Sequence, residues 1–194
     1  MSIAELTVRE VAELADVPIR SVNKAIEEKI VESRKAKGRK RRITLPLQTV
    51  AYAAVLGRLD LQLDKPTKRR LWQIFKKREV EEMTTTAVEI APSVTIDVPE
   101  LVGSDLAERA NAYVRWRNDC LEQNPEILGG TPVVRGTRLS VYSLLGRIDH
   151  GDTAESILED YPHLSEAALD MAVVFARTHP LIGRPGGRPW AEAS

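Results

Sequence analysis

The sequence predicts a mainly α-helical fold with short β-hairpins. Apolar residues recur at helical spacing in most segments, and residues that can cap helices stand before several of them. Short alternating or β-branched runs occur near residues 88–98 and 133–139. With 194 residues, 43% of them hydrophobic, the chain can bury a core as one large domain or as two to three small ones.

Composition excludes several classes of protein. The start, "MSIAELTVREVAELAD", has no basic region followed by an apolar run, and no stretch approaches the roughly 18 apolar residues of a membrane span. We therefore expect a cytoplasmic protein without a membrane partner. A single cysteine, Cys120, cannot form an internal disulfide, and three histidines without a ligand cluster predict no metal and no cofactor. Because no Ser-His or Cys-His pair is suitably placed, we expect no enzymatic activity.

The net charge of zero conceals a strong asymmetry. Residues 1–80 hold 19 Lys and Arg against 10 Asp and Glu, a net charge of +9, and the remainder holds 9 against 18, a net charge of −9. Only the first part has the electrostatics of a nucleic-acid binder.

The amino-terminal residues predict a helix-turn-helix. Thr7 and Glu10 have the spacing of a capping box, so the first helix is expected to begin near Val8. Asp16 tolerates the left-handed conformation of a short turn, and a second helix is expected from about Pro18. The outward residues of that helix suit base and phosphate contacts, although a merely solvated face is the alternative. These candidate DNA-binding residues are Arg20, Ser21, Asn23 and Lys24.

A basic segment, "SRKAKGRKRRITL", follows the second helix. It lies between short β-prone ends, Ile30–Val31 and Ile43–Leu45, and surrounds Gly38, which predicts a β-wing that contacts the sugar-phosphate backbone. Its candidate DNA-binding residues are Arg34, Lys35, Lys37, Arg39, Lys40, Arg41 and Arg42.

The middle of the chain predicts further helices and one hairpin. Apolar spacing indicates a helix over about 50–59 and another that begins near Pro66 and carries an apolar stripe from Leu71 to Val80. The basic residues beside that stripe either form a solvated face or extend the DNA-binding surface. Two strands are expected around a turn at residues 91–93, and then a helix over about 105–121.

The stretch "GGTPVVRGTRLSV", residues 129–141, poses a choice between a phosphate-binding loop and a tight hairpin. A phosphate-binding P-loop needs a Lys after its last glycine, whereas Gly136 is followed by Thr137 and Arg138. We therefore predict a hairpin in which Gly136 supplies the positive φ and Val133–Val134 pairs with the returning Arg138–Leu139. Three short helices are expected after it, to about residue 177.

Two parts of the chain resemble known families. The segment "ADVPIRSVNKAI" resembles the winged helix-turn-helix of MerR-like and excisionase-like regulators, although those proteins usually have a polar cap where this chain has Pro18. Residues Asn124–Arg177, with "NPEILGGTP", "RGTR" and "YPHL", closely resemble the domain of unknown function numbered 433. That resemblance implies a homeodomain-like trihelical domain with a leading hairpin that often self-associates.

An amino-terminal DNA-binding module joined to such a domain is similar to a class of VapB-type antitoxins. The resemblance implies repression of the protein's own operon and neutralisation of a PIN-domain ribonuclease toxin. The tail, "THPLIGRPGGRPWAEAS", is either disordered or an inhibitory segment that places Arg184 or Arg188 among the toxin's metal-binding carboxylates, with Trp190 as an anchor. The alternative function is a stand-alone MerR-like transcriptional regulator whose second half binds a ligand or dimerises.

The expected organisation has four parts, and a homodimer is expected because one recognition helix reads few base pairs. Residues 1–62 form the winged helix-turn-helix, 63–123 a connecting or dimerisation region, 124–177 the trihelical domain, and 178–194 the extended toxin-binding tail.

Overall fold

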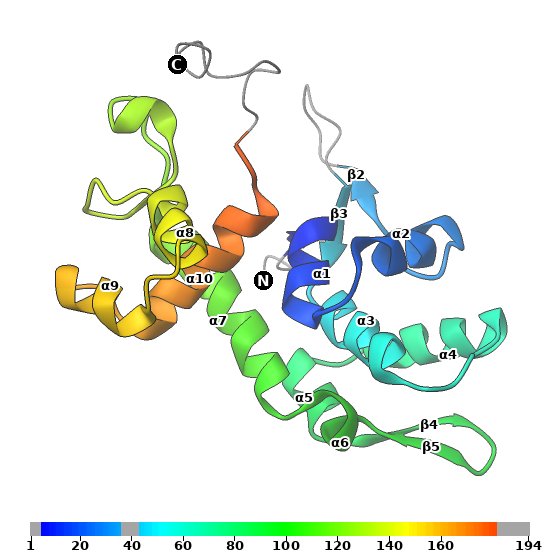
Figure 1. Ribbon diagram of the computed structural model, residues 1–194. Helices are drawn as coiled ribbons and strands as arrows, with labels where there is room; N and C mark the ends of the chain where they lie inside the picture. The colour runs from blue at the N-terminus through cyan, green and yellow to red at the C-terminus, as the bar shows by residue number, and fades with distance from the viewer. Residues whose placement is uncertain (1–4, 36–42, 182–194) are drawn as a thin grey trace, which may run out of the picture.

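The structure is a computed structural model that describes residues 5–35 and 43–181. Within these residues the fold is mainly helical, with three small antiparallel sheets, as the sequence predicts. Helix α7 (Asp105–Asp119) runs between the amino-terminal elements on one side and the last three helices on the other (Figure 1). No helix of the described residues is both long and apolar enough to cross a membrane.

The amino-terminal elements are two helices and a three-stranded sheet. Strand β1 (Glu5–Thr7) leads into α1 (Val8–Ala15), and α2 (Ile19–Glu27) follows a short turn. Strands β2 (Arg34–Lys35) and β3 (Ile43–Pro46) complete the sheet, whose order is β1-β3-β2. The expected strand at Ile30–Val31 is absent: these two side chains are buried in the core, and the pairing with β3 begins only at Arg34.

Two helices pack behind this unit. Helix α3 (Thr49–Arg58) is buried along most of its length, and Tyr52 contacts the ring of Trp72 from α4 (Lys65–Phe75) edge-on, with centroids 5.4 Å apart. The prediction that one apolar stripe reaches Val80 is wrong. Helix α4 ends at Phe75, and Val80 begins a separate helix, α5 (Val80–Thr84), because the chain turns over residues 76–79.

The expected hairpin is present as β4 (Ala87–Ala91) and β5 (Val94–Asp97). Ser93, in its turn, has a φ of 64°. Val98, predicted as a strand residue, instead opens the short helix α6 (Val98–Val102), which Asp97 caps. Helix α7 then buries Trp116 and Tyr113.

The glycine-rich stretch forms a tight loop, but its strand partner differs from the prediction. Strand β7 (Val133–Val134) pairs with β6 (Leu121–Glu122), directly after α7, and a 3₁₀ turn at Leu128–Gly130 lies between them. The returning segment forms no strand but an isolated bridge between Val133 and Ser140, in which the Val134 amide donates to the Leu139 carbonyl at 3.0 Å and the Val141 amide to the Pro132 carbonyl at 3.1 Å. Gly136 has the expected positive φ, 75°.

The last three helices are α8 (Val141–Asp149), α9 (Ala154–Asp160) and α10 (Glu166–Thr178). Their caps are Ser140, Thr153 and Ser165, each of which accepts a backbone hydrogen bond. The three helices contact one another, and α10 also packs against α1 and α7. The carboxy-terminal helices and the amino-terminal unit therefore share one continuous core.

Candidate nucleic-acid interface

Local interactions fix the position of α2. Thr7 and Glu10 form the capping box: the Glu10 amide donates to Thr7 Oγ1 at 3.2 Å, and the Thr7 amide donates to Glu10 Oε2 at 2.6 Å. Asp16 has φ 53° and ψ 53°, and its left-handed conformation reverses the chain. Helix α2 then begins at Ile19 behind Pro18, which gives no side-chain cap. Both helices begin where the sequence predicts, near Val8 and directly after Pro18.

Helix α2 presents an inner apolar face and an outer polar one. Val22 and Ala25 are buried, whereas all four residues predicted to contact DNA are exposed. None of the four forms an ion pair with another described residue, so their donors are available to a ligand. Arg and Asn side chains at such positions can make paired hydrogen bonds to base edges. These residues are Arg20, Ser21, Asn23 and Lys24.

The sheet places a further cation beside the helices. Arg34, on β2, has a side chain that is 69% exposed, and its Nη1 lies 3.1 Å from Glu5 Oε1. Thr44 Oγ1 donates to the other Glu5 oxygen at 2.8 Å, and these two hydrogen bonds lower the pKa of Glu5. Lys35 follows Arg34 on the same strand. The other basic residues predicted for the wing lie outside the described residues: Lys37, Arg39, Lys40, Arg41 and Arg42.

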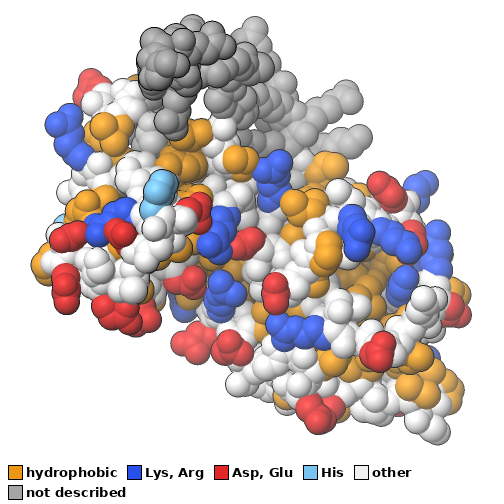
Figure 2. Space-filling view, viewed as in Figure 1, with side chains coloured by type: hydrophobic (Ala, Val, Ile, Leu, Met, Phe, Trp, Pro, Cys, Tyr) orange, Lys and Arg blue, Asp and Glu red, His pale blue; other side chains and the backbone are white. Residues whose placement is uncertain are grey.

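Helix α4 has the apolar stripe and the neighbouring basic residues that the sequence predicts. Leu71, Trp72 and Phe75 are buried, which confirms a packing face. Its opposite side exposes Lys65, Arg69 and Arg70. Figure 2 shows Lys and Arg side chains gathered over the α2 and α4 side of the molecule, whereas Asp and Glu side chains gather around α9. The charge asymmetry of the sequence is therefore also a spatial one.

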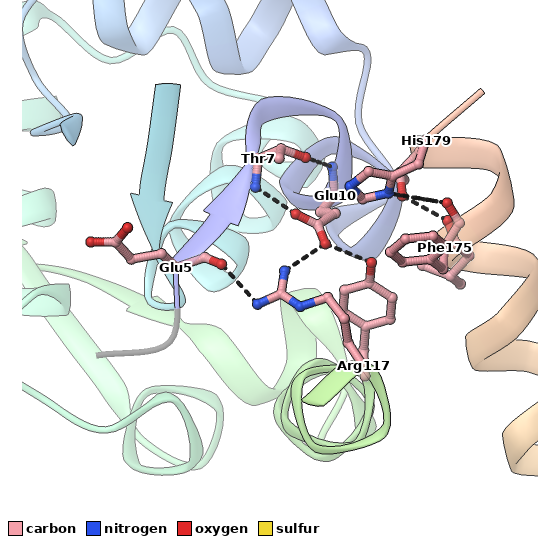
Figure 3. A network of polar contacts seen from close by, with 9 residues as sticks. Glu5, Thr7, Glu10, Arg117, Phe175 and His179 are labelled. Carbon is pink, nitrogen blue, oxygen red and sulfur yellow. Dashed lines mark hydrogen bonds and ion pairs between the residues drawn. The ribbon is translucent and has the colours of Figure 1, made fainter. Parts of the chain in front are cut away.

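A buried polar network joins α1 to α7. The Glu10 side chain is fully buried, and its Oε1 accepts hydrogen bonds from the Tyr113 hydroxyl and from Arg117 Nη1, both at 2.6 Å (Figure 3). Arg117 Nη2 donates to the Glu5 carbonyl at 2.9 Å. Burial tends to raise the pKa of Glu10, but the Arg117 charge and the hydrogen bonds from Thr7 and Tyr113 outweigh it, so the pKa lies below its ordinary value.

Sequence reasoning found only one part of this network. Glu10 was expected as half of a capping box, which uses one of its oxygens. Nothing in the sequence assigns Tyr113 or Arg117 to the other oxygen, because they lie 103 and 107 positions away. A Glu on the otherwise apolar face of α1 was the available signal, since buried carboxylates require a partner.

The remaining predicted residues are not brought into this interface. The residues predicted for toxin binding, Arg184, Arg188 and Trp190, lie outside the described residues. Cys120 is half-buried at the end of α7. No group of three or more His, Cys, Asp or Glu side chains among residues 5–35 and 43–181 could hold a metal ion.

Comparisons with known proteins assign one part of the chain to a protein family. A curated relative, the uncharacterized protein y4eO of Sinorhizobium fredii, is 38% identical over 92 residues. This match covers 47% of the present chain and only 40% of that relative. No solved structure shows significant similarity. Residues 121–176 match the family described as "Protein of unknown function (DUF433)", so β6, β7 and most of the three carboxy-terminal helices form a DUF433 domain.

Proposed function

We propose that this chain is an antitoxin that binds operator DNA through α2 and the β2–β3 segment and neutralises a PIN-domain ribonuclease. The observation that carries the DNA-binding half is the exposed, unpaired set Arg20, Ser21, Asn23 and Lys24 on a helix whose opposite face is buried. In this proposal α1 and α2 form the helix-turn-helix, and strands β2 and β3 belong to its wing.

The two basic elements have separate roles in this proposal. Helix α2 reads base edges in the major groove, and Arg34 with the neighbouring basic residues neutralises phosphates. A homodimer places two α2 helices on half-sites about 34–36 Å apart, one helical turn of DNA. The acidic surface around α9 faces away from DNA, since carboxylates repel phosphates.

The antitoxin half of the proposal rests on the resemblance to VapB-type proteins and on the DUF433 domain, which we take to be homeodomain-like. The three basic and aromatic tail residues would contact the toxin. A guanidinium matches a carboxylate cluster bidentately and keeps its charge at every accessible pH.

Two experiments test the two halves separately. DNA binding is measured by fluorescence anisotropy with the DNA upstream of the protein's own gene. The R20A/K24A double variant should lose this binding, and E27Q, which changes an exposed residue on the same helix without removing a donor cation, is the matched control. The toxin half is tested by co-purification with the product of the neighbouring gene and by a ribonuclease assay of that product with and without this chain.

The alternative is a stand-alone regulator that has no toxin partner. One observation favours it: a large groove adjoins the turn between α1 and α2, where a small ligand could act on DNA binding. Operator binding without any complex with the neighbouring gene product would support this alternative over the antitoxin.

A further inference from the structure

A groove of the described residues lies where the turn between α1 and α2 meets α7 and α10. Its volume is about 890 Å³, within the range of small-molecule sites. The turn residues 16–19 line it, together with Leu106 from α7 and Thr178 from α10. None of the residues assigned to DNA binding above lines it.

Four arginines from four different helices line this groove. They are Arg9 on α1, Arg58 on α3, Arg109 on α7 and Arg177 on α10. Arginines separated by up to 168 positions in the sequence therefore line one groove, whereas a solvated run of charges on a single helix would not be gathered in this way.

These arginines are only partly engaged. Arg177 lies 3.7 Å from Glu13 and 4.0 Å from Asp149, and Arg109 lies 3.5 Å from Asp170, so all three ion pairs are longer than the 2.7–2.9 Å of a strong charged hydrogen bond. Arg58 donates one hydrogen bond, to the Val102 carbonyl at 2.6 Å. Arg9 has no such partner among the described residues. Since each guanidinium has five N–H donors, most of them remain available.

The amino-terminal end of α2 adds to the positive potential. Pro18 and Ile19 line the groove, Pro18 provides no side-chain cap, and the first turn of α2 contains no acidic residue. The unpaired amides there carry a partial positive charge.

Three carboxylates also line the groove and limit what it can bind. They are Glu13, Asp16 and Asp105, against the four arginines, so the lining has one excess positive charge before the helix end is counted. They do not form a metal-binding group. Asp149 and Asp170 offset this excess from outside the lining, so the N–H donors that remain on the arginines, rather than the net charge, favour an oxyanion over a cation.

We propose that this groove binds a small anionic ligand that carries two or more phosphate or carboxylate groups. Several arginines that line one groove from different helices suit such a ligand because each guanidinium can bind an oxyanion bidentately. The site is separate from the proposed DNA-binding face and does not depend on the antitoxin role.

The test uses the full chain and isothermal titration calorimetry with inorganic triphosphate and with citrate at constant ionic strength. The groove variant is R109A/R177A, and the matched control is R20A/K24A, which removes two cations from α2. We expect the wild type and R20A/K24A to bind a probe equally, and R109A/R177A to bind it at least about tenfold more weakly, since charged hydrogen bonds are lost. R109K/R177K should bind with intermediate affinity because Lys cannot bind an oxyanion bidentately.

Three results would overturn the proposal. The first is no saturable binding of either probe. The second is equal weakening by both double variants, which indicates general attraction of polyanions. The third is loss of DNA affinity in R109A/R177A, which would make the groove part of the DNA-binding surface. Failure of the DNA-binding proposal would give a different result from failure of the anion-binding proposal, because R20A/K24A would then leave DNA affinity unchanged. The removed ion pairs are exposed, and circular dichroism checks that R109A/R177A is folded.

Discussion

Glu10 Oε1 and Arg117 Nη1 lie 2.6 Å apart, although 107 positions separate the two residues. The carboxylate belongs to the first helix of the proposed DNA-binding unit, and the guanidinium belongs to the last turn of α7, just before the DUF433 domain. Because the Glu10 side chain is fully buried, water cannot take the place of Arg117 as its hydrogen-bond partner. The ion pair therefore fixes α1 relative to α7 and to the helices that pack on it.

Removal of the Glu10 charge should strongly destabilise the protein. We expect Glu10→Gln to lower the free energy of unfolding by about 3 kcal/mol, because Arg117 remains largely buried without its counter-charge. Urea denaturation followed by circular dichroism measures the change. The control is Glu13→Gln, whose ion pair with Arg177 is partly exposed and should be worth less than about 1 kcal/mol. Equal effects of the two substitutions would contradict a special role for Glu10.

The same pair should make stability depend on pH in the acid range. The pKa of Glu10 is lower in the folded protein than in the unfolded chain, so the folded state holds its proton less tightly. Its contribution to stability is then complete above the unfolded pKa, about 4.3, and is lost as the pH falls through the folded pKa. Urea midpoints measured from neutral pH downward should fall more steeply for the wild type than for E10Q, in which this contribution is missing. Parallel pH profiles of the two proteins would argue against it.

Much of the local structure could be predicted from the sequence because its causes are local. The Thr7–Glu10 capping box, the turn at Asp16 and the positive φ of Gly136 depend on neighbours within a few residues, and the structure has all three. The partner of β7 could not be predicted in this way. Val133–Val134 can pair with any nearby strand. That it pairs with Leu121–Glu122 depends on where α7 ends in the folded protein.

The break between α4 and α5 has a similar origin. The apolar stripe continues in sequence from Leu71 to Val80, but burial of Val80 against the rest of the core requires a change of direction after Phe75. The groove arginines were missed altogether, because each belongs to a different helix and only the tertiary fold brings them together.

Gly57 should be difficult to replace, although it lies on the exposed side of α3. A Cβ at this position would lie 2.4 Å from Cγ1 of Val17, in the turn before α2. Alanine gains about 1 kcal/mol of helix propensity, but the overlap should cost more, for a net destabilisation of about 1–2 kcal/mol. Thermal unfolding should show that the G57A/V17A double variant is more stable than G57A alone, since Val17→Ala removes the overlapping methyl. A stabilised G57A protein would show that the turn can move away from α3.

The tail should be needed for toxin inhibition and dispensable for DNA binding. A chain that ends at Leu181 lacks Arg184, Arg188 and Trp190 but keeps α1, α2 and α10. We expect it to bind the operator with unchanged affinity and to leave the ribonuclease active. Full inhibition by this shortened chain would exclude the tail as the inhibitory segment. The R184A/R188A variant of the complete chain then tests whether the charges or the length of the tail matter.

Arg34 and Asn23 should affect DNA binding in different ways. Arg34 is held beside Glu5 on the exposed edge of the sheet, where it suits a phosphate, whereas Asn23 lies on the outer face of α2, where it suits a base edge. Arg34→Ala should weaken binding to operator and unrelated DNA by similar factors and reduce the slope of log affinity against log salt by about 1. Asn23→Ala should leave that slope unchanged and lower the preference for the operator, at a cost of about 1–3 kcal/mol. Anisotropy titrations at several salt concentrations with both DNAs separate the two effects. If Asn23→Ala changed the salt slope and Arg34→Ala changed the sequence preference, α2 would be the element that contacts the backbone and the assignment of the two roles would have to be exchanged.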